Sequence, residues 1–131
     1  MSAQLQPLTL AEFQAAARDH YLAAALWSTS DWCGDGERYL DSVDAEISPH
    51  SRAVMLAECD EFIAHNWALI VETGQTAEQC GHDLWLTRNG HGVGFWDRGY
   101  GLAIGDALTR AAHLAGERDL YLGDDGRIWQ A

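Results

Sequence analysis

Residues 82–99, HDLWLTRNGHGVGFWDRG, hold the densest set of side chains that could do chemistry. Two His, two Asp, two Arg and two Trp lie within this segment, together with four Gly. An imidazole beside a carboxylate can move a proton or bind a metal ion. Cys80, which precedes the segment, adds a thiol that such a pair could activate as a nucleophile. Whether the segment is an active site depends on the element that carries it.

The alternation of apolar residues predicts that this segment is a β-hairpin. Asn89-Gly90 favours a type I′ turn, because both central residues of that turn need a positive φ. The resulting register pairs His82 with Asp97 at the open end and puts His91 at the tip, so the two His are too far apart to bind one ion. One face carries the expected core residues Leu84, Leu86, Val93 and Phe95, and the other carries Asp83, Trp85, Thr87 and Trp96.

A structural interpretation of the segment competes with two chemical ones. In the structural interpretation, which we favour, His82 and Asp97 close the hairpin and the following residues turn the chain. Alternatively, a small enzyme or metal-binding protein would use His82 and Asp97 with a third group from elsewhere. A relay of Cys80, His82 and Asp97 is disfavoured, because residues two apart on a strand make no easy direct contact.

Capping and turn signals predict the elements around this hairpin. Helical spacing of apolar residues indicates two N-terminal helices and a third helix before the C-terminus. The signals are a Thr9/Glu12 capping box, Ser48 and Pro49 at the start of the second helix, Gly74 and Gly116 as helix ends, and Asp125-Gly126 as a hairpin turn between residues 120–122 and 128–129. Residues 28–37 are predicted to be a loop. The order α-α-ββ-α-ββ predicts a single α+β domain over residues 1–131, with a small antiparallel sheet packed on helices.

The charge balance is strongly acidic. Twenty Asp and Glu oppose eight basic residues, all of them Arg, and the formal net charge is −12 at pH 7. Within residues 31–61, the acids that we expect to face a partner are Asp31, Asp35, Glu37, Asp41, Asp44 and Glu46. Such a surface repels nucleic acid and anionic membranes and attracts a basic groove on another protein. An acidic surface that serves only solubility is the alternative.

The cysteines and the hydropathy pattern are typical of a reducing compartment. The three Cys form no CxxC motif, and we expect free thiols, with Cys59 in the core. No run of about 18 apolar residues occurs, and the first residues lack the features of a signal peptide. We therefore expect a cytoplasmic protein without a membrane span, and we expect no cofactor.

The segment GHDLWLTRNGHGVGFWDRG (81–99), followed by LYLGDDGRIW (120–129), resembles a group of small proteins encoded in bacteriophage and prophage genomes. YLAAALWSTSD (21–31) resembles their first helix, whereas the acidic middle of the chain is variable among them. The resemblance implies expression from a phage or mobile element inside a bacterial cell, and it brings no catalytic residues. Small acidic phage proteins of the anti-CRISPR and antirestriction classes bind host proteins, and some resemble DNA in charge.

These observations lead to one main hypothesis and two alternatives. The main hypothesis is a non-enzymatic phage protein whose acids bind and inhibit a host nucleic-acid-binding defence complex, such as a CRISPR effector subunit. Trp85 and Trp96, which share one face of the predicted hairpin, would add an aromatic contact to the partner. The alternatives are an enzyme or metal-binding protein that uses His82 and Asp97, and a phage accessory protein that self-associates through its Trp face.

Overall fold

The computed structural model describes residues 8–131, and their α+β class confirms the predicted fold class. Helices dominate, and the strands are only three residues long. The elements in chain order are α1 (Leu10–Ser28), β1 (Ser30–Trp32), β2 (Glu37–Tyr39), η1 (Leu40–Ser42), α2 (Pro49–His65), α3 (Trp67–Thr73), α4 (Ala77–Arg88), η2 (Phe95–Asp97), α5 (Leu102–Leu114), β3 (Leu120–Leu122) and β4 (Ile128–Gln130).

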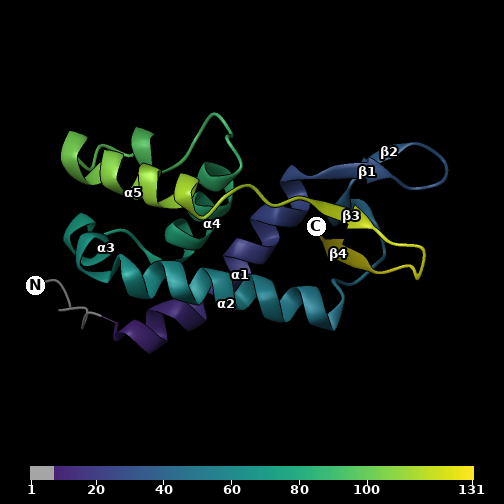
Figure 1. The fold of residues 1–131 in the computed structure, drawn as a ribbon, viewed down its shortest axis with the longest axis horizontal. Coiled ribbons are helices and arrows are strands. Elements are labelled where there is room, and N and C mark those ends of the chain that lie inside the picture. The colour runs from purple at the N-terminus through teal and green to yellow at the C-terminus, as the bar shows by residue number, and fades with distance from the viewer. Residues whose placement is uncertain (1–7) are drawn as a thin grey trace, which may run out of the picture.

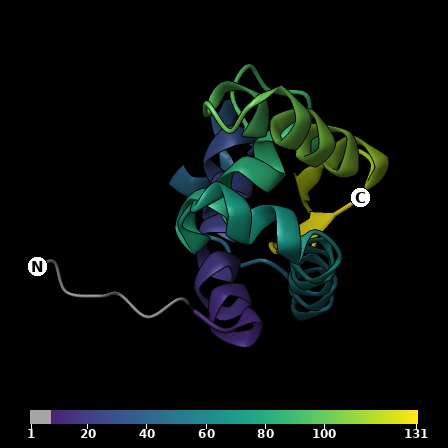
Figure 2. The same cartoon turned by 90° about the vertical axis from the view of Figure 1, so that its left-hand side faces the viewer.

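The molecule is elongated, with most of the helical structure toward one end and both hairpins at the other (Figure 1). β1 pairs with β2 and β3 pairs with β4, both in antiparallel register. A parallel bridge between Ile47 and Ile128 joins the second hairpin to the chain that enters α2. Figure 2, turned by 90°, shows the yellow-green α5 over one side of the helical part and the purple α1 and blue-teal α2 on the other. α1 and α4 share the most extensive contact between any two elements.

The predicted helix ends agree with the structure wherever a side chain caps the backbone. Thr9 and Glu12 form a reciprocal capping box at the start of α1, with nitrogen–oxygen distances of 2.9 and 3.1 Å. The Ser48 hydroxyl accepts from the Ser51 N–H at 3.1 Å and begins α2. Gly74 ends α3 in the left-handed conformation, as expected for a residue after a helix. The second helix, predicted to run without interruption from Ser48 to Gly74, is instead broken at Asn66 into α2 and α3. These local signals are reliable because they satisfy N–H and C=O groups that no helical bond can reach.

The predicted hairpin over residues 82–97 is wrong. Residues 77–88 form α4, and the chain then runs irregularly into η2. Asn89-Gly90 ends the helix instead of turning a hairpin: the Asn89 amide donates to the Trp85 carbonyl at 3.0 Å, and Gly90 has a φ of 72°. The positive φ that permits a type I′ turn also permits a helix stop, so the same dipeptide serves both structures.

The lack of a helical period in α4 follows from its burial on nearly all sides. Nine of its twelve residues are buried, including charged and polar ones. A helix that is buried on nearly all sides has no single apolar stripe. In its place, the alternation of Leu and other residues over residues 84–87 resembles the pattern of a strand. The signal that marks this helix is its N-cap, where the Thr76 hydroxyl accepts from the Gln79 N–H at 3.1 Å.

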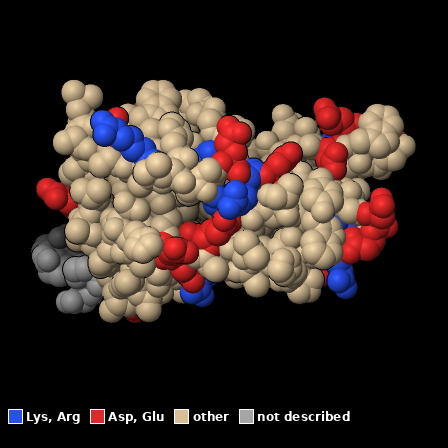
Figure 3. Space-filling view, in the orientation of Figure 1, with Lys and Arg blue, Asp and Glu red and all other residues tan. Residues whose placement is uncertain are grey.

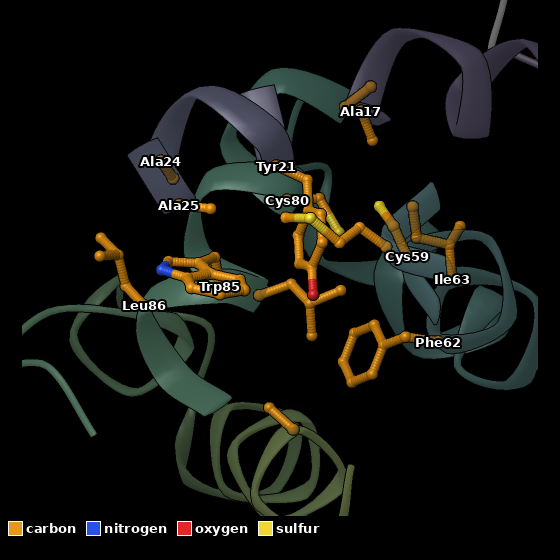
Figure 4. Packing of buried hydrophobic residues seen from close by; sticks show 14 of the residues in the cluster. Ala17, Tyr21, Ala24, Ala25, Cys59, Phe62, Ile63, Cys80, Trp85 and Leu86 are labelled. Atoms are coloured by element: carbon orange, nitrogen blue, oxygen red, sulfur yellow. The ribbon is translucent and has the colours of Figure 1, made fainter. Parts of the chain in front are cut away.

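The core is built around Trp85, the largest fully buried side chain (Figure 4). Its ring packs edge-on against Tyr21 of α1, with centroids 5.6 Å apart. Its indole N–H donates to the Ser28 hydroxyl at 3.0 Å, which satisfies the only polar atom of the side chain. A second aromatic pair, Phe62 on Phe95, is stacked at 5.7 Å and fixes η2 against α2.

Arg88, which precedes the Asn89-Gly90 turn of the predicted hairpin, is instead a buried structural residue of α4. Its side chain is 2 % exposed. The guanidinium donates to the Gly116 carbonyl at 2.7 Å and to the Ala115 carbonyl at 2.8 Å, which are free at the C-terminus of α5. A third bond, to the Tyr21 hydroxyl, is 2.9 Å long. The planar fork of donors therefore ties α5 and α1 to the end of α4.

Gly81 allows α4 to cross α1 at close range. A Cβ at this position would overlap the carbonyl oxygen of Ala17 and lie 3.1 Å from the backbone nitrogen of Tyr21. Both neighbours are backbone atoms inside a helix, so neither can move alone. The facing residues of α1 that are small and fully buried, Ala17, Ala24 and Ala25, complete this contact.

Alkaline pH is expected to unfold the protein through its buried weak acids. Burial raises the pKa of Tyr21 from its ordinary 10.0 to about 12 and that of the Cys59 thiol from 9.0 to about 12, while the pKa of Cys80 is also raised. The unfolded chain loses these protons first, so stability is full below pH 9 and falls as the pH rises toward 12. Each group contributes a slope of about 1.4 kcal/mol per pH unit within its own window.

Denaturant unfolding between pH 8 and pH 12 measures this slope. Tyr21→Phe removes one of the three groups, so its stability should fall less steeply than that of the wild type above pH 10. At neutral pH the Tyr21→Phe variant is less stable than the wild type, because the hydrogen bond from Arg88 to the Tyr21 hydroxyl is lost. The comparison therefore uses only the slope of stability against pH. Equal slopes in the two proteins would refute the assignment.

Candidate partner-binding surface

The β1–β2 hairpin spans residues 30–39, of which residues 30–37 were predicted to be a loop. Its turn is closed by a bond of 2.9 Å from the Cys33 N–H to the Gly36 carbonyl, and Gly34 has a φ of 92°. Ser30 pairs with Tyr39, Asp31 with Arg38 and Trp32 with Glu37. The glycines between the two strands indicate a turn in the sequence. The strands themselves could not be predicted, because three residues show too little alternation of apolar and polar side chains.

Asp31 has a structural role. One carboxylate oxygen accepts from the Leu122 N–H at 2.7 Å, and the other accepts from the Trp32 N–H at 2.8 Å. The first bond links β1 to β3, which are ninety-one residues apart in the chain. Asp31 is half-buried and therefore differs from the other five acids that the sequence predicted to face a partner.

The other five acids are all exposed, and we call them the hairpin-end acids: Asp35, Glu37, Asp41, Asp44 and Glu46. Asp124 and Asp125, in the turn of the second hairpin, are exposed as well. Figure 3 shows acidic side chains at the end of the molecule that carries both hairpins, with basic side chains beside some of them, and further acidic side chains near the middle of this face. Arg38 is already paired with Asp35 at 2.9 Å. Five of the six acids predicted from the sequence are therefore accessible, on the segment that forms the first hairpin and leads into α2.

Aromatic side chains accompany these acids, and the sequence did not predict their exposure. Trp32 is 66 % exposed, Tyr39 is 58 % exposed and Tyr121 of β3 is 44 % exposed. Because paired residues of an antiparallel hairpin share a face, Trp32, Glu37 and Tyr39 lie on the same side of β1–β2. Asp31 and Arg38 occupy the opposite side. The hairpin therefore presents two aromatic rings next to a carboxylate.

The predicted pair of His82 and Asp97 is wrong, because each side chain makes its own contact. His82 stacks on the half-exposed ring of Trp27 with centroids 5.7 Å apart, and its Nδ1 lies 3.2 Å from the Asp83 carboxylate. Asp97 accepts from the Gly94 N–H at 3.0 Å and caps η2. Among the described residues, no hydrogen bond or ion pair joins the two side chains and no metal-ligand group includes them, so the acid–base or metal site expected from this pair is not formed.

The buried carboxylate of this region belongs instead to Asp83, whose side chain is fully buried. Arg98 donates to both of its oxygens, at 2.8 and 3.0 Å. This bidentate pair fastens the segment after α4 back onto the helix. The hydrogen bond with Asp83 raises the pKa of Arg98, which remains charged. Asp83 and Arg98 are fifteen residues apart in the chain, and no local sequence pattern indicates that they pair.

Cys80 and Trp85 also lie elsewhere than predicted. Cys80 is fully buried, and burial raises the pKa of its thiol well above the ordinary value, which is the opposite of what a nucleophile needs. Trp85 is 1 % exposed in the core, whereas Trp96 is 57 % exposed on η2. The predicted Trp face therefore does not exist, because the Trp85 ring is not accessible to a partner.

Asp83→Ala should lower the free energy of unfolding by about 3 kcal/mol, because it leaves Arg98 without its buried partner. His82→Ala should cost less than about 1 kcal/mol, since the Asp83–Arg98 pair survives. Denaturant unfolding of both variants, and of each in an Arg98→Ala background, gives the coupling energies. Similar losses for His82→Ala and Asp83→Ala would contradict this ranking.

Within residues 8–131, no group of three His, Cys, Asp or Glu side chains is arranged to hold a metal ion. In the same part of the chain, no helix is both long and apolar enough to cross a membrane. No family model, curated protein or solved structure matches this chain.

Proposed function

We propose that the protein is a phage-encoded inhibitor that binds the basic nucleic-acid-binding surface of a host defence protein. The observation that carries the proposal is the exposure of the five hairpin-end acids on one end of a chain with a net charge of −12. Surfaces that bind nucleic acid are rich in Arg and Lys that neutralise phosphates. A rigid acidic end can occupy such a surface and exclude the nucleic acid.

Charge complementarity would act on the rate of association and on the choice of partner. Clustered carboxylates steer a basic partner toward the hairpin end and repel nucleic acid. At physiological salt this attraction extends over about 8 Å, so acids at the other end of the molecule contribute little. Binding should therefore weaken as the salt concentration rises.

The exposed aromatic rings favour arginine over lysine in the partner. A guanidinium can stack on the face of Trp32 or Tyr39 while its N–H groups donate in pairs to the neighbouring Glu37 carboxylate. A lysine ammonium has no plane to stack and no such fork. Exposed aromatics of this kind also supply much of the binding energy at protein interfaces. We therefore propose an Arg-lined groove as the site of binding.

The resemblance to bacteriophage and prophage proteins supports the choice of target. A phage protein that acts inside a bacterial cell meets nucleic-acid-binding defence machines in the cytoplasm. Restriction enzymes and CRISPR effectors both hold nucleic acid in basic channels. We propose a protein of the anti-CRISPR or antirestriction type, without catalytic chemistry of its own.

Capture from bacterial lysate tests the proposal. The immobilised protein is exposed to lysate treated with nuclease, washed at low salt and eluted at high salt, and the released proteins are identified. We expect a nucleic-acid-binding protein that elutes with salt. A bound protein that withstands high salt, or one without a nucleic-acid-binding surface, would count against the proposal.

A further inference from the structure

An apolar patch lies away from the hairpin end, at the start of α5. Leu102, the first residue of α5, is 93 % exposed, and Trp96 of η2 is 57 % exposed. Beside them is a hollow of about 560 Å³, whose lining includes both residues, Tyr100, Gly105, Thr109 and the acidic Asp106. We call the first five of these residues the α5 patch. Isolated apolar side chains are common on protein surfaces, but a group around an apolar hollow marks a contact site.

We propose that two copies of the protein associate through the α5 patch in a weak, two-fold symmetric dimer. A two-fold interface uses the same surface on both copies, so one patch must carry both a projection and the hollow that receives it. The α5 patch has both, because Leu102 projects next to the hollow. In the dimer, Leu102 of each copy enters the hollow of the other and packs against Trp96.

The charges around the patch favour a second copy as its occupant. With a net charge of −12, two copies repel each other, most of all at their hairpin ends. Around the α5 patch the charges nearly balance instead. Asp106 and Arg110 form an ion pair of 2.6 Å, and Arg98, which binds the buried Asp83, also lies 4.0 Å from Asp97. This face therefore carries less unpaired negative charge than the hairpin end, and a second copy can approach it with less repulsion.

The fold presents Trp96 from a fixed backbone. Its neighbour Phe95 is fully buried and stacked on Phe62, and the Phe95 N–H donates to the Thr87 hydroxyl at 3.2 Å. The Asp83–Arg98 pair holds the other side of η2. An apolar side chain held in one position loses little freedom on binding, which favours association through it.

Sedimentation velocity from about 1 µM to about 1 mM tests the dimer, since this range spans the affinities of small interfaces. The wild type should shift from monomer to dimer as its concentration rises, and added salt should strengthen the association by screening repulsion. Leu102→Asp and Trp96→Ala should both remain monomeric. Leu114→Asp is the matched control, because Leu114 is 88 % exposed on the same helix but outside the patch. This variant should associate as the wild type does.

A wild type that stays monomeric at the highest concentration overturns the proposal. So does dimerisation that persists in Leu102→Asp or disappears in Leu114→Asp. Circular dichroism and the melting temperature confirm that each variant is folded. Because binding to a basic partner weakens with salt whereas this association strengthens, failure of the dimer is distinguishable from failure of the proposed function.

Discussion

Gly81→Ala should destabilise the protein by about 3 kcal/mol or more, although alanine is the better helix former. Helix propensity alone would make this substitution stabilising by about 1 kcal/mol. The new methyl group, however, would overlap the Ala17 carbonyl oxygen, which belongs to the backbone of α1. Relief requires α1 and α4 to move apart, and their contact holds much of the core. The sign of the effect therefore tests the helix crossing directly.

Gly92→Ala is the control for this substitution. Gly92 has open space around it and an ordinary φ, so the added methyl group meets nothing. We expect a change within about 0.5 kcal/mol in denaturant unfolding. If Gly81→Ala were as stable as Gly92→Ala, α4 would not cross α1 as described.

Reversal of three hairpin-end acids should weaken partner binding by about 100-fold or more, which corresponds to about 2.7 kcal/mol. The variant carries Glu37→Lys, Asp41→Lys and Asp44→Lys, whose side chains are exposed. Asp31 is left unchanged because its carboxylate joins the two hairpins. The affinity is measured by calorimetry with the protein captured from lysate.

The matched control reverses three exposed acids elsewhere, with Asp19→Lys, Glu61→Lys and Glu72→Lys. Each variant changes three charges by two units, so both move the net charge from −12 to −6. If position matters, the control should lose less than about 5-fold in affinity, because distant charges are screened. Equal losses in the two variants would mean that net charge, and not the hairpin end, determines binding.

Signals that act between near neighbours could be predicted from the sequence. The caps at Thr9 and Ser48 satisfy backbone groups within three residues, and Asp125-Gly126 turns a hairpin whose strands follow at once. α5, expected to end at Gly116, spans Leu102–Leu114. The clustered charge of residues 31–61 predicted an exposed acidic surface, since unpaired carboxylates are rarely buried, and five of the six acids expected to face a partner are exposed.

Features that depend on distant residues could not be predicted in this way. α4 looks like a strand because its polar residues are buried with partners that lie far along the chain, as Arg88 does with the end of α5. Asp83 and Arg98 are fifteen residues apart, and nothing local pairs them. The sequence predicts that Asp31 is a free acid like its neighbours, because its partner, the Leu122 N–H, comes close to it only in the folded chain.

Competition with nucleic acid is the most direct measurement of the central claim, that the hairpin end occupies a nucleic-acid-binding surface. A labelled oligonucleotide is bound to the captured host protein, and the wild-type protein is titrated in while fluorescence anisotropy follows the oligonucleotide. We expect displacement by the wild type and, within about 5-fold of the same concentration, by the Asp19/Glu61/Glu72 control, whereas the hairpin-end variant should need about 100-fold more protein. Formation of a ternary complex, with the oligonucleotide still bound at saturating wild-type protein, would contradict the claim.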